Sequence, residues 1–344
     1  LPIPQFTTVI RQGIQRTIKL RPCPQLYIIE GVLESNKFKS NSEVVCPICA
    51  SPRARVIGAK GAYDIGRCRA CGHLFSVTPP TPETLKEFYR VYSYEVYDLS
   101  RVPAFAFAVL NDEVTAFEPY RKTNRFLEVG FGAGAMLQVA QRRGWETYGI
   151  ETSSMAVQKA QGKGHAAILE VDFLAAPYPE GHFDVIVALG VLEHLPDPLP
   201  VIGHAARLLS PGGVFYATTP NGAGISPRLL GLDWSTLCPP EHIHLFSPKS
   251  LELALAQRGF SKVSIACEGT NPHEVLHHLR RKFRPKGGIP AGNENVFDHG
   301  TTSTSLNQQL MSNRAGNTFK KLANVVLRGT RLGDTLKAFG TKGG

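Results

Sequence analysis

The 344-residue sequence lacks any apolar run long enough to cross a membrane as a helix. Such a helix needs about 20 consecutive apolar residues, so the sequence excludes a helical integral membrane protein. It also lacks the basic start, apolar run and small-residue cleavage site of a secretory signal. It begins with Leu1 rather than with methionine, so we expect the natural start to be processed or to lie further upstream. No internal repeat is present, which argues against a repeat fold.

Charged residues make up only 19% of the chain and apolar residues 42%, values that allow a sizeable core and exclude wholesale disorder. At about 150 residues per domain, the length predicts roughly two domains. There are 38 Lys and Arg against 28 Asp and Glu, and most of the excess lies between Arg280 and Lys342. This basic section favours an anionic partner, such as a phosphorylated substrate, a nucleic acid or a membrane surface; a solvated basic face is the alternative.

Four of the seven cysteines form two C-x-x-C pairs, and 18 residues separate the pairs. Without a secretory signal, this spacing predicts a tetrahedral zinc site rather than disulfides or four unrelated thiols. We expect a structural ion, because four thiolates leave no position for a reacting water. His73 could replace one ligand, but we expect it to face solvent. Reduced thiolates favour a cytoplasmic location. The four predicted ligands are Cys46, Cys49, Cys68 and Cys71.

Breaks and periodic segments divide the chain into four predicted parts. Residues 1–41 form an N-terminal extension, residues 42–80 the zinc ribbon and residues 81–120 a helical linker or lid. Residues 121–344 form the main domain, which contains an insertion at about 268–333 before its final strand.

Helical spacing of apolar residues predicts two helices in the linker, at 83–92 and 103–117. Tyrosines in the connection between them can line an acceptor pocket or simply pack. These tyrosines are Tyr92, Tyr94 and Tyr97.

After residue 124 the pattern changes to strands that alternate with helices, which predicts a parallel, doubly wound sheet. The alternating segment at the C-terminus adds an antiparallel last strand. The predicted fold class is therefore α/β, with a seven-stranded Rossmann-like sheet, a small N-terminal zinc ribbon and a helical insertion. We expect strands at 126–129, 147–151, 167–171, 183–189, 213–219, 262–267 and 334–342. We expect helices at 135–143, 154–161, 248–258, 274–283 and 318–328.

A glycine-rich loop joins the first of these strands to the first helix. Gly130, Gly132 and Gly134 allow the backbone to approach a ligand where a side chain would clash. The G-x-G-x-G spacing differs from the G-x-G-x-x-G of dinucleotide-binding proteins. Spacing alone does not exclude a nicotinamide cofactor, because some dinucleotide-binding folds tolerate alanine at the position of Ala135.

Acidic residues accompany this loop. Glu151 ends the second strand and can accept hydrogen bonds from both ribose hydroxyls of a nucleoside. Asp172 ends the third strand and can accept a hydrogen bond from an adenine amino group, with Phe173 beside the ring. Glu128 lies inside the first strand, where its burial requires a positive ligand group or neighbouring backbone amides.

Together these segments resemble the class I S-adenosylmethionine-dependent methyltransferases. The run 126–134 is similar to their first motif, 171–173 to their adenine-side motif and 183–195 to their fourth strand and the turn after it. The run 208–213 is similar to the turn before their fifth strand. The resemblance implies S-adenosyl-L-methionine as the cofactor, bound by the glycines and acids above, with Leu189 as a further contact.

The order of the zinc ribbon, Phe88-Tyr89, the main domain and the segment 240–247 resembles a bacterial subgroup of zinc-ribbon methyltransferases, close to methyltransferase domain family 23. Members of this subgroup modify sugars, glycans and secondary metabolites. The resemblance implies O-methylation of a small or medium-sized metabolite, with a sugar carbon or a nitrogen as alternative acceptors. The basic section suits an acceptor that carries a phosphate or a nucleotide.

Three histidines are candidate catalytic residues, because a hydroxyl acceptor benefits from a base whose pKa is near neutral. His194 follows the fourth strand, at the edge where ligands bind in such sheets. His242 and His244 lie in the segment after the fifth strand, on one side of it if it is extended. The alternative for each is a local hydrogen bond that fixes its loop. Trp234 in the same segment can line the pocket or pack in the core.

An RNA methyltransferase is the alternative function, with the ribbon and the basic section binding phosphates. Against it, the ribbon lacks an aromatic stacking platform. The turn 189–194 also differs from the Asn/Asp-Pro-Pro-Tyr/Phe motif used on exocyclic amino groups of bases. A non-catalytic scaffold is a third alternative, which the intact glycine loop and its acids argue against. We therefore expect a small-molecule acceptor rather than a nucleic acid.

Overall fold

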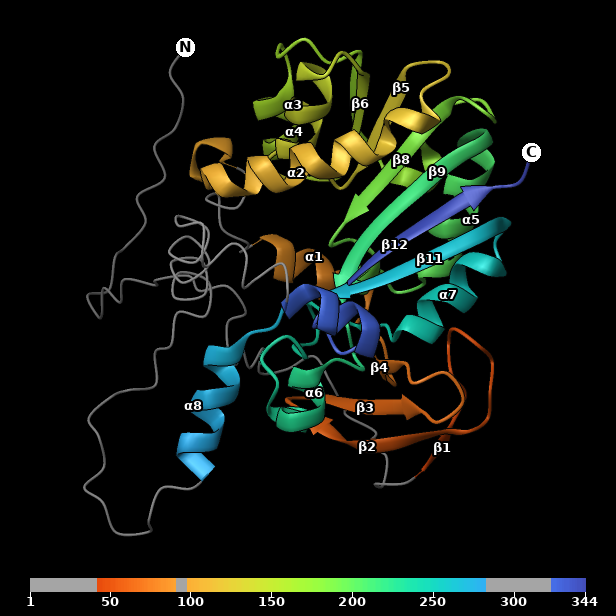
Figure 1. The fold of residues 1–344 in the computed structure, drawn as a ribbon. Coiled ribbons are helices and arrows are strands. Elements are labelled where there is room, and N and C mark those ends of the chain that lie inside the picture. The colour runs from red at the N-terminus through yellow and green to blue at the C-terminus, as the bar shows by residue number, and fades with distance from the viewer. Residues whose placement is uncertain (1–41, 91–97, 283–322) are drawn as a thin grey trace, which may run out of the picture.

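The computed structural model describes residues 42–90, 98–282 and 323–344, which form two β-sheets with their covering helices (Figure 1). Within these residues, no helix is long and apolar enough to span a membrane. The predicted N-terminal extension and the middle of the insertion lie outside the described residues. So do the three tyrosines of the linker, Tyr92, Tyr94 and Tyr97.

The larger sheet has seven strands in the order β11-β12-β9-β8-β5-β6-β7. Its strands run parallel except β12, which pairs antiparallel with both of its neighbours. The predicted α/β class, with seven strands and an antiparallel last strand, is confirmed. The strands are β5 (Arg125–Val129), β6 (Glu146–Glu151), β7 (Ala167–Glu170), β8 (Phe183–Leu189), β9 (Leu209–Pro220), β11 (Phe260–Glu268) and β12 (Thr335–Lys342).

Helices cover both faces of this sheet. Successive residues of β8 point to opposite faces: Val185 packs in the apolar cluster under α2 and α3, and Ile186 in the cluster under α5 and α7. A strand buried on both faces reads as a continuous apolar run, which is why β8 was identifiable from the sequence. The helices of the main domain are α2 (Ala104–Phe117), α3 (Ala135–Arg142), α4 (Ser154–Ala160), α5 (Pro198–Leu208) and α7 (Pro248–Ala256).

The fifth strand begins earlier than the sequence predicted. Leu209 pairs with Phe183 and Val214 pairs with Val185, so the residues between them form a bulge rather than a free turn. Gly212 lies in this bulge with φ 74°, a conformation that glycine adopts readily. The expected Ser-Pro-Gly-Gly turn is therefore built into β9.

The smaller sheet contains the four cysteines and has the order β1-β2-β3-β4-β10. Its first four strands come from the ribbon, whereas β10 comes from the segment after β9. All of its pairings are antiparallel. The ribbon and the main domain therefore share one sheet. The strands are β1 (Glu43–Val44), β2 (Ala54–Lys60), β3 (Tyr63–Cys68), β4 (Leu74–Ser76) and β10 (His244–Leu245).

Short helices complete the described residues. In the insertion, α8 agrees with the helix predicted at 274–283 as far as it is described. Residues 323–330 are helical, which overlaps the helix predicted at 318–328 but ends two residues later. The other short helices are α1 (Pro82–Arg90), α6 (Ile225–Leu230), α8 (Pro272–Lys282) and the single turns η2 (Leu99–Arg101), η3 (Glu118–Tyr120), η4 (Phe173–Ala175), η5 (Leu192–His194) and η6 (Gly231–Asp233).

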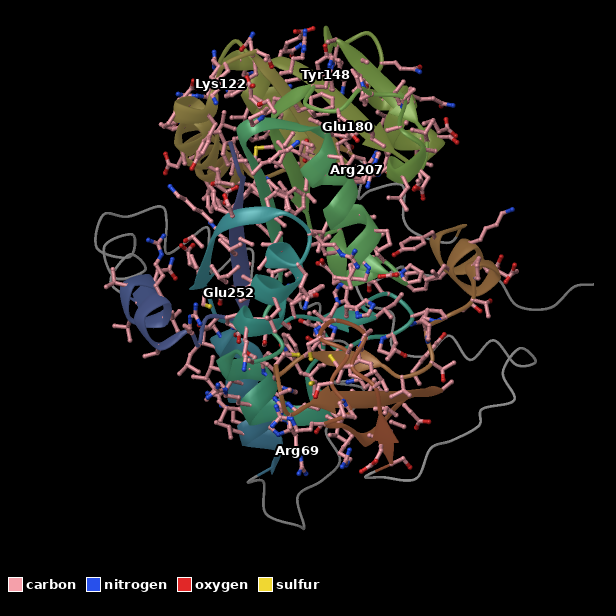
Figure 2. All side chains as sticks on the ribbon, turned by 90° about the vertical axis from the view of Figure 1, so that its right-hand side faces the viewer. Arg69, Lys122, Tyr148, Glu180, Arg207 and Glu252 are labelled. Carbon is pink, nitrogen blue, oxygen red and sulfur yellow. The ribbon has the colours of Figure 1, made fainter. Side chains whose placement is uncertain are left out.

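The ribbon lies on the side of the molecule toward which the parallel strands point. In Figure 2, Lys122, which precedes β5, and Arg69 of the ribbon lie at opposite ends of the molecule. The carboxyl ends of β5, β6 and β8 therefore face the ribbon. Ligands bind at this edge in open α/β sheets, so the candidate site lies on the side of the main sheet that faces the ribbon.

Candidate active site

The glycine-rich loop after β5 leaves an open space at its centre. Gly130, Gly132 and Gly134 all have positive φ, at 65°, 50° and 75°. A Cβ at Gly130 would lie 2.8 Å from Val191, whereas a Cβ at Gly132 would meet no atom of the described residues within 4 Å. The loop therefore needs glycine for its backbone conformation, and Gly132 faces a space that a ligand can fill.

Glu151 ties the end of β6 to this loop. Its Oε2 accepts a hydrogen bond from the backbone N–H of Gly132 at 3.0 Å. Its Oε1 accepts from the N–H groups of Thr152 at 2.7 Å and Ser153 at 3.1 Å. A carboxylate has about four acceptor positions, so Oε2 keeps one that can accept a hydroxyl of a bound ribose.

Glu128 joins the first strand of the site to the helix after the glycine-rich loop. It is only 3% exposed, and its Oε2 accepts a hydrogen bond from the N–H of Leu137, in the first turn of α3, at 3.0 Å. Burial raises the pKa of Glu128 well above its ordinary value. A backbone amide therefore partly satisfies this carboxyl group and joins β5 to the start of α3.

The third strand ends in a turn that Asp172 caps. Its Oδ1 accepts a hydrogen bond from the N–H of Leu174 at 2.7 Å, while the residue remains exposed. The ring of Phe173 is buried against His204, with ring centroids 4.9 Å apart. The ring is therefore part of the core, and only the backbone of Phe173 remains to border a bound adenine. Leu189 ends β8 and is partly exposed at the same edge.

Two histidines meet at the carboxyl end of β8. His194 closes the turn η5, and its ring centroid lies 4.8 Å from that of His242, which comes from the segment between β9 and β10. Tyr89 of α1 approaches from a third direction, with its hydroxyl 3.2 Å from Nδ1 of His194. The sequence placed Tyr89 in a helix but gave no signal that this helix reaches the fourth strand.

Backbone carbonyls determine which ring nitrogen carries the proton in both histidines. Nδ1 of His194 lies 2.9 Å from the carbonyl oxygen of Glu241, and Nδ1 of His242 lies 2.6 Å from that of Thr236. A carbonyl oxygen only accepts, so Nδ1–H donates in each case. Burial lowers the pKa of His194 to about 4, and this ring is therefore neutral near neutral pH.

Glu193 lies beside these rings with its carboxyl group out of solvent. It is 3% exposed, and its Oε2 has no hydrogen-bond partner among the described residues. Burial raises the pKa of Glu193. A carboxylate oxygen of Glu193 and one ring nitrogen each of His194 and His242 lie within 4.8 Å of one another. The sequence suggested only that Glu193 orients a helix, because the contact with His242 joins segments 49 residues apart.

His244 lies in a different environment from His242. It is 3% exposed, and its Nε2 lies 3.3 Å from the carbonyl oxygen of Pro196. Its Nδ1 lies 3.0 Å from Nε2 of His73, so both of its ring nitrogens are engaged. The two histidines therefore do not share a site, although they are two residues apart. The structure places His244 in the contact between the ribbon and the main domain.

His73 is fully buried, and the expectation that it faces solvent is wrong. β10 pairs with β4 and covers the ring, which also stacks with Phe75 and packs against Phe246. The sequence could not show this cover, because it comes from a strand about 170 residues further along the chain. Trp234 is likewise part of the core, in a cluster between the ribbon and α6.

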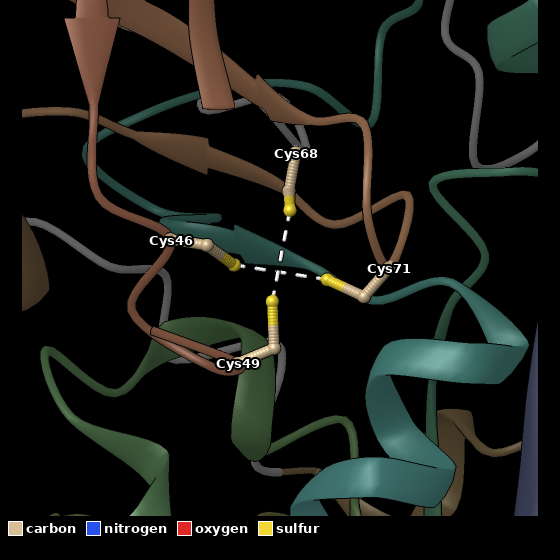
Figure 3. A group of neighbouring side chains, drawn as sticks. All are labelled: Cys46, Cys49, Cys68 and Cys71. Atoms are coloured by element: carbon tan, nitrogen blue, oxygen red, sulfur yellow. Dashed lines mark hydrogen bonds between the residues drawn. The ribbon is translucent and has the colours of Figure 1, made fainter. Parts of the chain in front are cut away.

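The four ribbon cysteines converge on one point (Figure 3). The Sγ atoms of Cys46 and Cys71 are 3.7 Å apart, and so are those of Cys49 and Cys68. A zinc ion with four sulfurs at about 2.3 Å requires sulfur atoms about 3.8 Å apart, so the arrangement fits tetrahedral zinc. Gly72, with φ 80°, allows the turn after the second pair.

Hydrogen bonds join this ribbon to the histidines. The N–H of Ser76 donates to the carbonyl oxygen of Ile243, whose own N–H donates to the carbonyl oxygen of Glu193 at 2.8 Å. The hydroxyl of Ser247 donates to the carbonyl oxygen of Cys71. The segment after β9 is therefore held on one side by the cysteine turn and on the other by the turn that carries His194.

Comparison with known proteins supports one family. Residues 86–265, slightly more than half of the chain, match a family model described as a methyltransferase domain. A ubiquinone biosynthesis O-methyltransferase from Bordetella avium is 26% identical over 167 residues, which cover 45% of this chain and 69% of that protein. A 27-O-demethylrifamycin SV methyltransferase from Amycolatopsis mediterranei is 32% identical over 128 residues, which cover 34% of this chain and 47% of that protein.

Other relatives are covered to a similar extent. A ubiquinone biosynthesis O-methyltransferase from Alkalilimnicola ehrlichii is 33% identical over 130 residues, which cover 35% of this chain and 52% of that protein. The chain thus spans between about half and about two thirds of the length of these relatives. Among solved structures, a SAM-dependent methyltransferase from Archaeoglobus fulgidus is similar with a TM-score of 0.44 and 15% identity, covering 69% of this chain and 94% of that one. The fold assignment rests on the sheet order itself.

Proposed function

The chain belongs to the methyltransferase domain family, and we propose that it transfers the methyl group of S-adenosyl-L-methionine to a hydroxyl oxygen of a small or medium-sized metabolite. The S-adenosylmethionine-dependent methyltransferase activity follows from the family and from the curated relatives. Transfer to oxygen is supported by the relatives that are named O-methyltransferases. The same relatives also support a small-molecule acceptor.

The glycine loop and its neighbours form the proposed cofactor site. The open space at Gly132 takes the ribose and the methionine part of the cofactor, and Oε2 of Glu151 accepts a ribose hydroxyl. Asp172 and the backbone of Phe173 border the adenine, with Leu189 on its other side. Glu128 contributes indirectly, because it fixes the loop to α3 through the N–H of Leu137.

The acceptor hydroxyl is activated by Glu193, His194 and His242, which we call the β8-edge cluster. In methyl transfer the C–S bond of the sulfonium breaks as the new C–O bond forms, and the hydroxyl proton has to leave. The cluster lies at the carboxyl end of β8, the same edge as the cofactor site. In His194 and His242 the backbone carbonyl oxygens engage Nδ1, so Nε2 of each ring remains for the acceptor. His244 is left out of this proposal, because both of its ring nitrogens are engaged elsewhere.

The ribbon cysteines hold a structural zinc ion in this proposal. The ion stabilises the turn at Cys71, which in turn holds the segment that carries His242. The zinc therefore supports the acceptor site without taking part in the reaction, since four thiolates close its coordination shell.

The open space at Gly132 beside Glu151 is the observation that carries the proposed function. The first test is calorimetric titration of the purified protein with S-adenosylmethionine and S-adenosylhomocysteine. The second is incubation with S-adenosylmethionine and sugars, phenols and polyketide alcohols, with the methylated atom identified by mass spectrometry. Failure to bind either cofactor form would overturn the proposal, as would methylation of RNA in preference to every small acceptor.

A further inference from the structure

The β8-edge cluster combines residue types that bind transition metals. Two imidazoles and one carboxylate are the ligand set of several catalytic metal sites, which keep an open position for substrate. The three residues come from two segments, the turn after β8 and the loop before β10. Their ligand atoms nevertheless lie within 4.8 Å of one another. Small side-chain adjustments around an ion would bring them to bonding distance.

The protons of both imidazoles are already placed as in a metal site. A metal-bound histidine typically donates its other ring N–H to a carbonyl or carboxylate group, which orients the ring. Here Nδ1–H of His194 donates to Glu241 and Nδ1–H of His242 donates to Thr236, both through backbone carbonyl oxygens. In each ring Nε2 is thus the nitrogen that remains for a cation, which binds it in the unprotonated form.

The carboxyl group of Glu193 provides an independent indication. An ionised carboxylate is costly to bury unless a cation or several donors compensate its charge. Oε2 of Glu193 has no hydrogen bond of normal geometry in the described residues, although the nearby hydroxyl of Thr219 and the ring of His242 partly offset the effect of burial on the pKa of Glu193. A divalent cation beside Glu193 would supply the missing positive charge. The zinc of the ribbon cannot do so, since its four thiolates surround it.

We propose that Glu193, His194 and His242 form a second metal site that binds a divalent transition-metal ion, with Zn²⁺ as the ion that fits best. Three protein ligands leave an open coordination position, unlike the closed shell of the ribbon cysteines. Another triplet of ligand-type residues, Cys238, Glu241 and His242, shares one histidine with this site. Cys238 faces Nδ1 of that ring, which carries the proton, so the second triplet does not compete.

The ion would explain how the cluster activates an acceptor, and this consequence rests on the proposed function. A hydroxyl bound at the open position loses its proton more easily, because the cation stabilises the alkoxide. The proton passes to solvent water, and the alkoxide oxygen attacks the methyl carbon as the C–S bond breaks. Binding of the ion itself does not depend on the identity of the acceptor.

Metal content tests the site directly. The purified full chain is loaded with Zn²⁺ and separated from free metal by gel filtration. The number of zinc ions bound per chain is then measured by mass spectrometry. We expect about two zinc ions per chain in the wild type and about one in Glu193→Gln and in His242→Asn. His182→Asn is the matched control, since His182 is partly buried at another place in the domain, and it should keep both ions.

Cobalt spectra identify the second site. With Co²⁺ in place of zinc, the ribbon site gives sulfur-to-cobalt charge-transfer bands, whereas the second equivalent adds only the weaker bands of nitrogen and oxygen ligands. About one ion per chain in the wild type would overturn the proposal, as would a second ion that persists in both variants. Calorimetric titration with S-adenosylmethionine on the same samples separates this outcome from failure of the proposed function, because cofactor binding does not require the cluster.

Discussion

Nε2 of His73 in the ribbon lies 3.0 Å from Nδ1 of His244 in the main domain. Since Nε2 of His244 donates to the carbonyl oxygen of Pro196, its Nδ1 accepts a hydrogen bond from His73. Both rings are buried, and the contact lies next to the pairing of β4 with β10. A polar contact therefore connects the cysteine ribbon to the segment that also carries His242.

The effects of replacing His73 and His244 on stability should be strongly coupled. We expect His73→Phe and His244→Phe each to lower the free energy of unfolding by about 1–3 kcal/mol, because each leaves a buried polar partner unsatisfied. The double variant should lose less than the sum of the two, since it removes both polar groups. Urea denaturation of the four proteins measures the coupling. Additive losses would mean that the hydrogen bond contributes little.

Replacement of Gly132 by alanine should weaken cofactor binding while changing the fold little. The added Cβ would project into the space assigned to the cofactor, so we expect the affinity for S-adenosylmethionine to fall at least about tenfold. Gly181→Ala is the matched control, because Gly181 also has a positive φ of 71° and open space around its Cα. The two variants should therefore share a similar backbone strain. Calorimetry that finds equal cofactor affinity in both would contradict the assigned site.

The two histidines of the β8-edge cluster should affect the chemical step rather than cofactor binding. We expect His194→Asn and His242→Asn each to lower kcat by about 100-fold or more, because the acceptor hydroxyl then loses its activating group. Affinity for S-adenosylmethionine should change less than about threefold, with His182→Asn as the control. Single-turnover rates with the acceptor found in the screen provide the measurement. Normal rates in both variants would remove these residues from the mechanism.

Loss of one ribbon cysteine should cost stability. Cys68→Ser removes one of four ligands, and we expect the free energy of unfolding to fall by about 3 kcal/mol or more, which lowers Tm by roughly 6 °C or more. Cys238→Ser is the matched control, since Cys238 lies outside the ribbon and should leave the zinc in place. Thermal unfolding with and without a chelator gives the comparison. A chelator without effect on the wild type would argue against a structural ion.

Protonation of Glu268 at acidic pH should lower the free energy of unfolding. Burial by itself would raise the pKa of Glu268, but Lys337, 3.2 Å away, and Arg328 lower it below its ordinary value. Because the pKa of Glu268 is lower in the folded protein than in the unfolded chain, its ionised carboxylate stabilises the fold at pH values above its unfolded-state pKa. This stability is lost as the pH falls through its folded-state pKa. Glu268→Gln should therefore reduce stability at pH 7 and flatten its decline between about pH 5 and pH 3. Urea denaturation across this range measures both effects; parallel curves for wild type and variant would refute the assignment.

Much of the architecture follows from local sequence patterns. The strands of the main sheet were identifiable from short apolar runs such as β8 or, for β12, from alternating residues, and their alternation with helices implies parallel neighbours in most of the sheet. The spacing of the cysteine pairs likewise predicted that four sulfurs converge. Such features depend on residues close together in the chain, where backbone geometry allows few alternatives.

Local patterns left the roles of individual side chains open. Glu128 was compatible with a ligand or a backbone amide, and only the structure showed that the N–H of Leu137 donates to it. For Phe173, only the structure showed that α5 brings His204 against its ring. In both cases the deciding partner belongs to another element, whose position is set by the whole core.

The sequence by itself determined the fold class, the family and the pairs of cysteines, because periodicity, glycine conformations and ligand spacing act over a few residues. Only the tertiary structure decided that His73 is buried, that His242 and His244 belong to different environments, and that Glu193 meets His242. These contacts depend on how β10 pairs with β4 across about 170 residues. Such a pairing is selected by burial and hydrogen bonding of the complete core, which no short stretch of sequence contains.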